Sequence, residues 1–145
     1  MNTSLIVVFS IILASLISGV GYYDFRYSQR LALTQKLEEQ RTDGREALLD
    51  MAKRQEAYFK AQKSYTADLA ALGYKEIEDL SVPTPGKFYK LVILTADATN
   101  YSLAAEPQGE QVGDGKCGGL TLTKQGMAKS ARGSDGTACW QISND

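Results

Sequence analysis

Residues 47–74, ALLDMAKRQEAYFKAQKSYTADLAALGY, contain the end of a long helix and the beginning of a globular head. At roughly 100° per residue, a mostly apolar set of side chains in this stretch falls on one arc of about 140°. These positions are Ala47, Leu48, Met51, Ala52, Gln55, Tyr58, Phe59 and Gln62. Asp50 and Arg54 lie outside the arc at the i,i+4 spacing that supports an exposed helix face. The pattern therefore predicts an amphipathic helix that covers a sheet.

The chain after this helix carries turn and strand signals. Residues 74–87 contain two of the prolines and predict an irregular connection. Residues 88–95 (FYKLVILT) and 101–106 (YSLAAE) are rich in β-branched and aromatic residues and flank a DATN turn, so they predict a hairpin. Residues 120–123 predict a third strand and residues 140–143 an edge segment. The expected fold class is α+β, with a three- to four-stranded antiparallel sheet on the helix.

Composition narrows the classes of function. The chain has 145 residues, 43% of them hydrophobic, which suits one modest domain with an extension. Its formal net charge of -1 gives no overall attraction to nucleic acid or to anionic lipid. Histidine is absent from the sequence, which removes the usual general base and every Ser-His or Cys-His arrangement. We therefore expect a protein that is not an enzyme.

The two cysteines are Cys117 and Cys139. If they pair, closing the loop between them restricts the unfolded chain by roughly 3 kcal/mol on the chain-entropy model. Such a bond persists in oxidising compartments, which favours the periplasm or the exterior. The alternative is a pair of free thiols in a cytosolic protein.

An uncharged apolar run, LIVVFSIILASLISGV, begins at Leu5 and ends at Val20. It is slightly short for a bilayer core, but the two following tyrosines extend it as an interfacial belt would. We expect residues 1–23 to form a transmembrane helix; a signal peptide cleaved near Gly19 is the alternative. The basic residues that follow the run would place the rest of the chain in the cytoplasm by the positive-inside rule, whereas the cysteines favour a periplasmic head. We expect the periplasmic orientation.

Residues 24–62 lack proline and contain mostly good helix formers, so they predict one continuous helix with Gly44 as its weak point. We expect residues 24–46 to form a helical stalk and residues 47–145 to form the head. The sparse leucines of the stalk fit either a solvated linker or a surface that packs against other subunits.

Several segments resemble the type IV pilin family, and specifically minor pilins of the PilE type. They are RTDGREALLDMAKRQEAYF (41–59), SYTADLAALGY (64–74), FYKLVILT (88–95), YSLAAEP (101–107), KCGGLTLTKQG (116–126) and ACW (138–140). The resemblance implies a long N-terminal helix, membrane-embedded in its first part, on an antiparallel sheet with a C-terminal disulfide loop. It also implies a structural component of a type IV pilus or of a related secretion or competence system. The expected partners are other pilins and inner-membrane assembly proteins, with the membrane contacted through residues 5–20.

The N-terminal segment departs from the pilin pattern. Pilins carry a basic leader, a glycine at the prepilin peptidase site and a glutamate early in the mature helix, whereas the first acidic residue here is Asp24. Two further roles therefore stay open beside that of a minor subunit. One is a pilin-derived, membrane-anchored accessory protein of the pilus, and the other is a DNA-binding competence pilin.

Four basic residues without an intervening acid mark the C-terminal loop as a candidate contact surface for DNA or a partner subunit. They are Lys116, Lys124, Lys129 and Arg132. A solvated loop without a ligand is the alternative. Tyr101 and Trp140 are candidate stacking surfaces for bases, with core packing as the alternative for Trp140.

The glycine-rich loop at residues 109–119 superficially resembles a phosphate-binding loop. Cys117 stands where such a loop needs Ser or Thr, and the spacing of an EF-hand is also absent. We expect a turn-rich loop and no catalytic, cofactor-binding or metal site.

Overall fold

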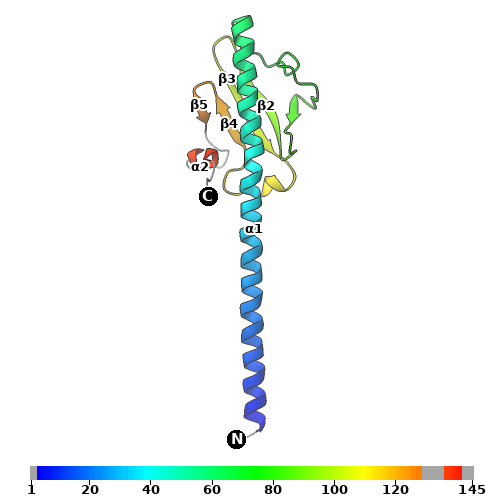
Figure 1. Ribbon diagram of the computed structural model, residues 1–145, viewed down its shortest axis with the longest axis vertical. Coiled ribbons are helices and arrows are strands. Elements are labelled where there is room, and N and C mark those ends of the chain that lie inside the picture. Colours follow the sequence, from blue (N-terminus) through cyan, green and yellow to red (C-terminus); the bar gives the residue numbers. More distant parts are fainter. Residues whose placement is uncertain (1–2, 129–135, 142–145) are drawn as a thin grey trace. The chain divides into compact units, whose positions relative to one another are not determined.

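The computed structural model describes residues 3–128 and 136–141, with side chains for residues 20–126 and 138–141 (Figure 1). Its contacts divide the chain into two compact units, Met1–Lys36 and Leu37–Asp145, which we describe separately. One helix, α1 (Thr3–Gln62), contributes to both units. The continuous helix expected over residues 24–62 is therefore confirmed, and Gly44 does not interrupt it.

The first unit is helical throughout its described residues. Its exposed part carries large apolar and aromatic side chains, at Val20, Tyr22, Tyr23, Phe25, Tyr27, Leu31 and Leu33. Within the described part of the chain, no helix combines the length and the apolar character needed to cross a membrane. The structure describes no side chains for residues 1–19, which include almost all of the apolar run from Leu5 to Val20. The membrane anchor expected there therefore stays a prediction.

The second unit is built on a five-stranded antiparallel sheet in the order β1-β2-β3-β4-β5. Within this unit α1 lies across the sheet (Figure 1). The described strands are β1 (Ser81–Pro83), β2 (Tyr89–Ala96), β3 (Tyr101–Pro107), β4 (Leu120–Thr123) and β5 (Gly126–Ala128). The expected hairpin and third strand are confirmed as β2, β3 and β4, and with them the α+β class.

Two short edge strands were not predicted. β1 lies within residues 74–87, which were expected to be irregular, and it ends at Pro83. Proline lacks the N–H that a central strand would need, so it is tolerated at a sheet edge. β5 pairs with β4 after a tight turn at Lys124 and Gln125.

The sequence predicts an edge strand at residues 140–143, and this prediction is wrong for Trp140. Trp140 ends a short helix, α2 (Gly136–Trp140), and residues 142 and 143 lie outside the described part. The carbonyl oxygens of Cys139 and Gln141 both accept hydrogen bonds from the Arg45 side chain, at 3.2 and 2.7 Å. The side chain of Arg45 thus joins α1 to the backbone at the end of α2.

The core of the second unit lies between α1 and the sheet. Leu48 and Met51 of α1 are fully buried, as are Tyr89 of β2 and Leu103 of β3. Burying such a side chain contributes roughly 1.5–3 kcal/mol, so this layer stabilises the folded head. The amphipathic stripe predicted from residue 47 onward is confirmed, but buried side chains of α1 begin earlier, at Leu37.

The predicted disulfide between Cys117 and Cys139 is present, with an S–S distance of 2.08 Å. Both cysteines are buried in the core. The bond joins the loop before β4 to α2, and it thereby holds the C-terminal segment against the sheet.

A substitution at Gly44 tests how closely α1 packs against the sheet. A Cβ there would lie 2.9 Å from Cδ2 of the fully buried Tyr89 ring. We expect Gly44→Ala to destabilise the protein, because overpacking costs about 1–3 kcal/mol and outweighs the gain of about 1 kcal/mol in helix propensity. Denaturant unfolding followed by the fluorescence of Trp140, the single tryptophan, measures the change.

Gly21→Ala is the matched control in the same helix. The position of its Cβ has no neighbouring heavy atom within 4 Å in the described part of the chain. We expect this substitution to leave the denaturant concentration at the unfolding midpoint unchanged or to raise it slightly. Equal effects of the two substitutions would contradict the close packing of α1 on Tyr89.

Candidate functional site

Three segments that are distant in the sequence meet at one end of the second unit. They are the end of α1, the turn between β2 and β3, and the turn between β4 and β5. The backbone N–H of Tyr65, just after α1, donates to the Asp97 carbonyl at 3.0 Å, and that of Lys124 donates to the Tyr101 carbonyl at 3.3 Å. We call this end, defined by Phe59, Tyr65, Thr99, Tyr101 and Lys124, the tip.

Stacked aromatic rings form the body of the tip. The Phe59 and Tyr65 rings stack with centroids 4.7 Å apart, and Tyr65 meets Tyr101 edge-on at 4.9 Å. The Tyr65 hydroxyl donates to the Glu56 carboxylate at 3.1 Å. Lys63 ends the helix in the left-handed conformation, with φ of 60°. These contacts give the tip a rigid platform made from both α1 and the sheet.

Lys124 lies over this platform. Its ammonium is 5.2 Å from the Tyr65 ring centroid and 5.5 Å from that of Phe59, which is within the range of cation–π attraction. It also donates a hydrogen bond to the Thr99 carbonyl at 2.8 Å. An ammonium has three donors, and one of them binds Thr99. Lys124 therefore presents an exposed positive charge that can donate further hydrogen bonds. Lys60 and Lys63 add exposed positive charges at the end of α1.

The β2–β3 turn is held by Asp97. One of its carboxylate oxygens accepts from the Thr99 N–H at 2.7 Å, the Thr99 hydroxyl at 3.0 Å and the Asn100 N–H at 2.8 Å. The backbone hydrogen bonds from Thr99 and Asn100 are the main cause that lowers the pKa of Asp97. The amide of Gln125 donates to that of Asn100 at 2.7 Å, which ties the two turns together.

Of the four basic residues predicted as a contact surface, the structure describes two, Lys116 and Lys124. Lys116 precedes β4 and Lys124 follows it, so they lie at opposite ends of that strand. Lys129 and Arg132 lie outside the described residues. Of the two described lysines, Lys124 is the one that lies over an aromatic platform.

The predicted stacking surfaces are also placed differently. Tyr101 and Trp140 are both buried, with 6% and 8% of their surface exposed, so neither offers an open face to a base. The core-packing alternative therefore holds for Trp140. Phe59 and Tyr65, which carry Lys124, were not predicted as part of a site, because nothing local in the sequence shows that residues so far apart meet.

The loop at residues 109–119 is closed by a buried ion pair at the other end of β4. Arg41 of α1 donates two hydrogen bonds to the Asp114 carboxylate, at 2.6 and 2.8 Å, and each side chain is only 2% exposed. The backbone N–H groups of Lys116 and Cys117 donate to the same carboxylate. Burial alone would raise the pKa of Asp114, but Arg41 and these N–H groups more than offset it and lower the pKa.

Gln111 extends this network into the core. Its amide donates to the Tyr89 hydroxyl at 2.7 Å and to the Leu37 carbonyl at 3.2 Å. Burial raises the pKa of Tyr89 to about 12, so the hydroxyl stays protonated. The loop at residues 109–119 contains a 3-10 helix, η1 (Gly109–Gly113). Its buried carboxylate, Asp114, is already bonded to Arg41. In the described residues, no group of three His, Cys, Asp or Glu side chains is arranged to hold a metal ion.

Residues 33–121 match the model of a family described as type IV minor pilin ComP, DNA uptake sequence receptor. The match spans more than half of the chain. The chain belongs to the type IV minor pilin ComP family. No curated protein matches it.

Membership of the ComP family makes this chain a structural component of a type IV pilus or of the related competence system, associated with the pilus or the cell envelope. The match begins in α1 and ends within β4, so it covers the Arg41–Asp114 pair and the aromatic rings of the tip. Lys124 lies just beyond its end. The type IV pilin resemblance of the sequence is thereby confirmed at the level of a minor pilin.

The buried pair predicts a strong dependence of stability on Asp114. We expect Asp114→Asn to cost about 3–5 kcal/mol, because it leaves the buried Arg41 guanidinium with only the more distant Glu38, at 3.9 Å, as a counter-charge. Asp50→Asn is the matched control: Asp50 pairs with Arg54 at 2.7 Å, but the two side chains are 55% and 40% exposed. Breaking that exposed pair should cost no more than about 1 kcal/mol.

The same pair predicts a pH dependence. Because the folded-state pKa of Asp114 is lowered, its contribution is present above the unfolded value of about 3.9 and is lost as the pH falls through the folded value. Urea unfolding between pH 3 and pH 7 should show this loss in the natural protein and a weaker pH dependence in Asp114→Asn. Similar costs and pH profiles for the Asp114 and Asp50 variants would contradict the buried pair.

Proposed function

We propose that this chain is a DNA-binding competence pilin whose tip contacts the phosphate backbone of DNA. Two observations support the proposal. The family to which the chain belongs is described as a DNA uptake sequence receptor. The tip holds the Lys124 ammonium in a fixed position over two aromatic rings, and this is the observation that carries the proposal.

A fixed ammonium suits a phosphate for a physical reason. Binding DNA releases counterions from the phosphates, and each cation that is already in place loses little side-chain freedom on contact. Lys124 is held by the Thr99 carbonyl and by the rings of Phe59 and Tyr65. Lys60 and Lys63 would add further phosphate contacts from the end of α1.

The other basic residues enter the proposal as secondary contacts. Lys116 is exposed at the opposite end of β4, where it would reach a different part of a bound duplex or a partner subunit. Lys129 and Arg132 stay predicted contacts for DNA or for a partner.

The proposed setting is the bacterial inner membrane, with the apolar run from Leu5 to Val20 as the anchor and the head in the periplasm. The buried Cys117–Cys139 disulfide supports an oxidising compartment for the head. Other pilins and inner-membrane assembly proteins are the proposed partners. The finer assignment to the PilE type rests on the segment resemblance alone.

DNA binding by the full-length chain in detergent tests the proposal. We expect labelled double-stranded DNA to bind with an affinity that falls steeply with salt. Lys124→Gln should weaken binding and reduce the slope of log affinity against log salt by about one unit, the value for one lost phosphate contact. Fluorescence anisotropy across a salt series measures both quantities.

Lys90→Gln is the matched control. It removes the same charge from a half-buried lysine of β2 that pairs with Glu106 at 3.2 Å, away from the tip. We expect it to leave the salt slope unchanged. If the natural protein binds no DNA, or if the two variants behave alike, the proposed role of the tip is wrong.

A further inference from the structure

A collar of basic and aromatic side chains follows the apolar run on helix α1. Its members are Tyr22, Tyr23, Arg26, Tyr27 and Arg30, which line a hollow of about 320 Å³. At roughly 100° per residue, these positions fall on one arc of about 140°. The three tyrosines are 59%, 76% and 65% exposed, and both arginines are exposed as well. The first unit therefore presents one helix face on which guanidinium groups and aromatic rings are interleaved.

The arginines of the collar lean toward the apolar run. Side chains of an α-helix tilt toward its N-terminus, and the Arg26 guanidinium accordingly lies 5.7 Å from the ring centroid of Tyr22, one turn nearer the run. Measured from Tyr23, Arg26 starts about 5 Å and Arg30 about 10 Å farther along the helix. The headgroup layer adds roughly 5–8 Å on each side of a bilayer core. If the run lies in the bilayer, the tilt therefore brings the guanidinium groups to the level of the headgroups.

The face that carries the collar has an excess of positive charge. Asp24 is the single acidic residue among residues 20–36. It lies about 160° from Arg26 and about 120° from Arg30 around the helix axis, so it does not share their face. The collar thus needs an anion from outside the first unit to balance its two guanidinium groups.

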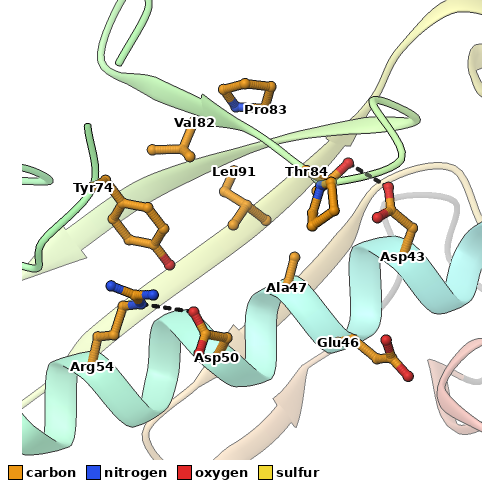
Figure 2. Close-up of a pocket in the computed structure, with 11 residues that line it drawn as sticks. Asp43, Glu46, Ala47, Asp50, Arg54, Tyr74, Val82, Pro83, Thr84 and Leu91 are labelled. Carbon is orange, nitrogen blue, oxygen red and sulfur yellow. Dashed lines mark hydrogen bonds and ion pairs between the residues drawn. The ribbon is translucent and has the colours of Figure 1, made fainter. Parts of the chain in front are cut away.

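A groove in the second unit has the opposite charge (Figure 2). It lies between α1 and β1 and encloses about 430 Å³. The carboxylates of Asp43, Glu46 and Asp50 line it, together with the guanidinium of Arg54. Because Arg54 pairs with Asp50, the remaining charge of the groove is negative. Of these two hollows, the collar is the one that suits an anionic ligand.

We propose that the collar binds the phosphate group of an anionic phospholipid, such as phosphatidylglycerol, at the membrane surface. Arg26 and Arg30 supply planar sets of N–H donors that match the oxygens of a phosphate. The tyrosines present rings with an apolar body and a polar hydroxyl, which suit the boundary between the bilayer core and water. The proposal rests on the membrane setting proposed for the chain and does not depend on DNA binding at the tip.

A free phosphate has the same chemistry, but two observations favour a lipid. The collar directly follows the uncharged run from Leu5 to Val20 on one continuous helix. Its exposed rings also add apolar surface between the two arginines, which an acyl chain and a glycerol group can contact and a free phosphate cannot. An anionic lipid therefore matches both the charge and the aromatic character of the collar.

Native mass spectrometry of the full-length chain in a neutral detergent tests the proposal. The chain is mixed with equal amounts of phosphatidylglycerol and phosphatidylcholine, which both contain a phosphate and differ in net charge. We expect a lipid adduct in which phosphatidylglycerol dominates. Arg26→Gln and Arg30→Gln should each lower the ratio of the two adducts about fivefold, which corresponds to the attraction of about 1 kcal/mol per basic residue near an anionic membrane surface.

Lys53→Gln is the matched control, because it removes one positive charge from an exposed position of α1 in the second unit. We expect it to leave the adduct ratio unchanged, as should an excess of inorganic phosphate. Equal adducts of the two lipids with the natural chain would overturn the proposal. It would also be overturned if Lys53→Gln acted like the arginine variants, or if inorganic phosphate displaced the lipid.

Flotation of the natural chain with phosphatidylcholine vesicles tests the membrane setting separately. A chain that floats but shows no preference for phosphatidylglycerol would retain the anchor and contradict the collar. A chain that does not float would contradict the anchor and the collar with it. Circular dichroism of each variant verifies that α1 stays helical. Neither measurement contains DNA or alters Lys124, so both are independent of DNA binding at the tip.

Discussion

The buried pair of Arg41 and Asp114 is the constraint on which the arrangement of the head depends. It joins the middle of α1 to the loop that leads into Cys117 and β4, across 73 residues of sequence. Burying two charges is costly because both lose their hydration. Here the cost is offset by a bidentate pair of hydrogen bonds from Arg41 to Asp114 and by the N–H groups of Lys116 and Cys117. β4 begins just after this loop and ends just before Lys124. The ion pair therefore also helps to fix the position of Lys124.

The parts of the fold that depend on local sequence were predictable. The stripe from Ala47 to Gln62, the hairpin strands and the paired cysteines follow from periodicity, propensity and composition. The stripe could have been extended back through Arg41, Gly44 and Arg45, which continue its helical spacing, but arginine and glycine give no apolar signal. The edge strand β1 was missed for a related reason, since Pro83 marks a loop unless the strand is known to lie at an edge.

The candidate site was less predictable because its parts are brought together by the fold. Lys124 was singled out for its charge, whereas the features that distinguish it are the rings of Phe59 and Tyr65 and the Thr99 carbonyl. These partners come from three segments, and their meeting requires the end of α1 and two β-turns to be placed correctly. Lys116 and Lys124, which the sequence grouped in one candidate contact surface, lie beyond opposite ends of β4 in the structure.

The net charge of -1 conceals a separation of charge within the head. Lys124 gives the tip a fixed positive charge, while Asp43 and Glu46 leave the groove beside β1 negative. At physiological salt, exposed charges act over a Debye length of about 8 Å, so local groups and not the net charge select what binds. An anionic polymer is therefore attracted at the tip and repelled by the groove. For the proposed contact with DNA, this distribution of charge favours the tip over the groove beside β1.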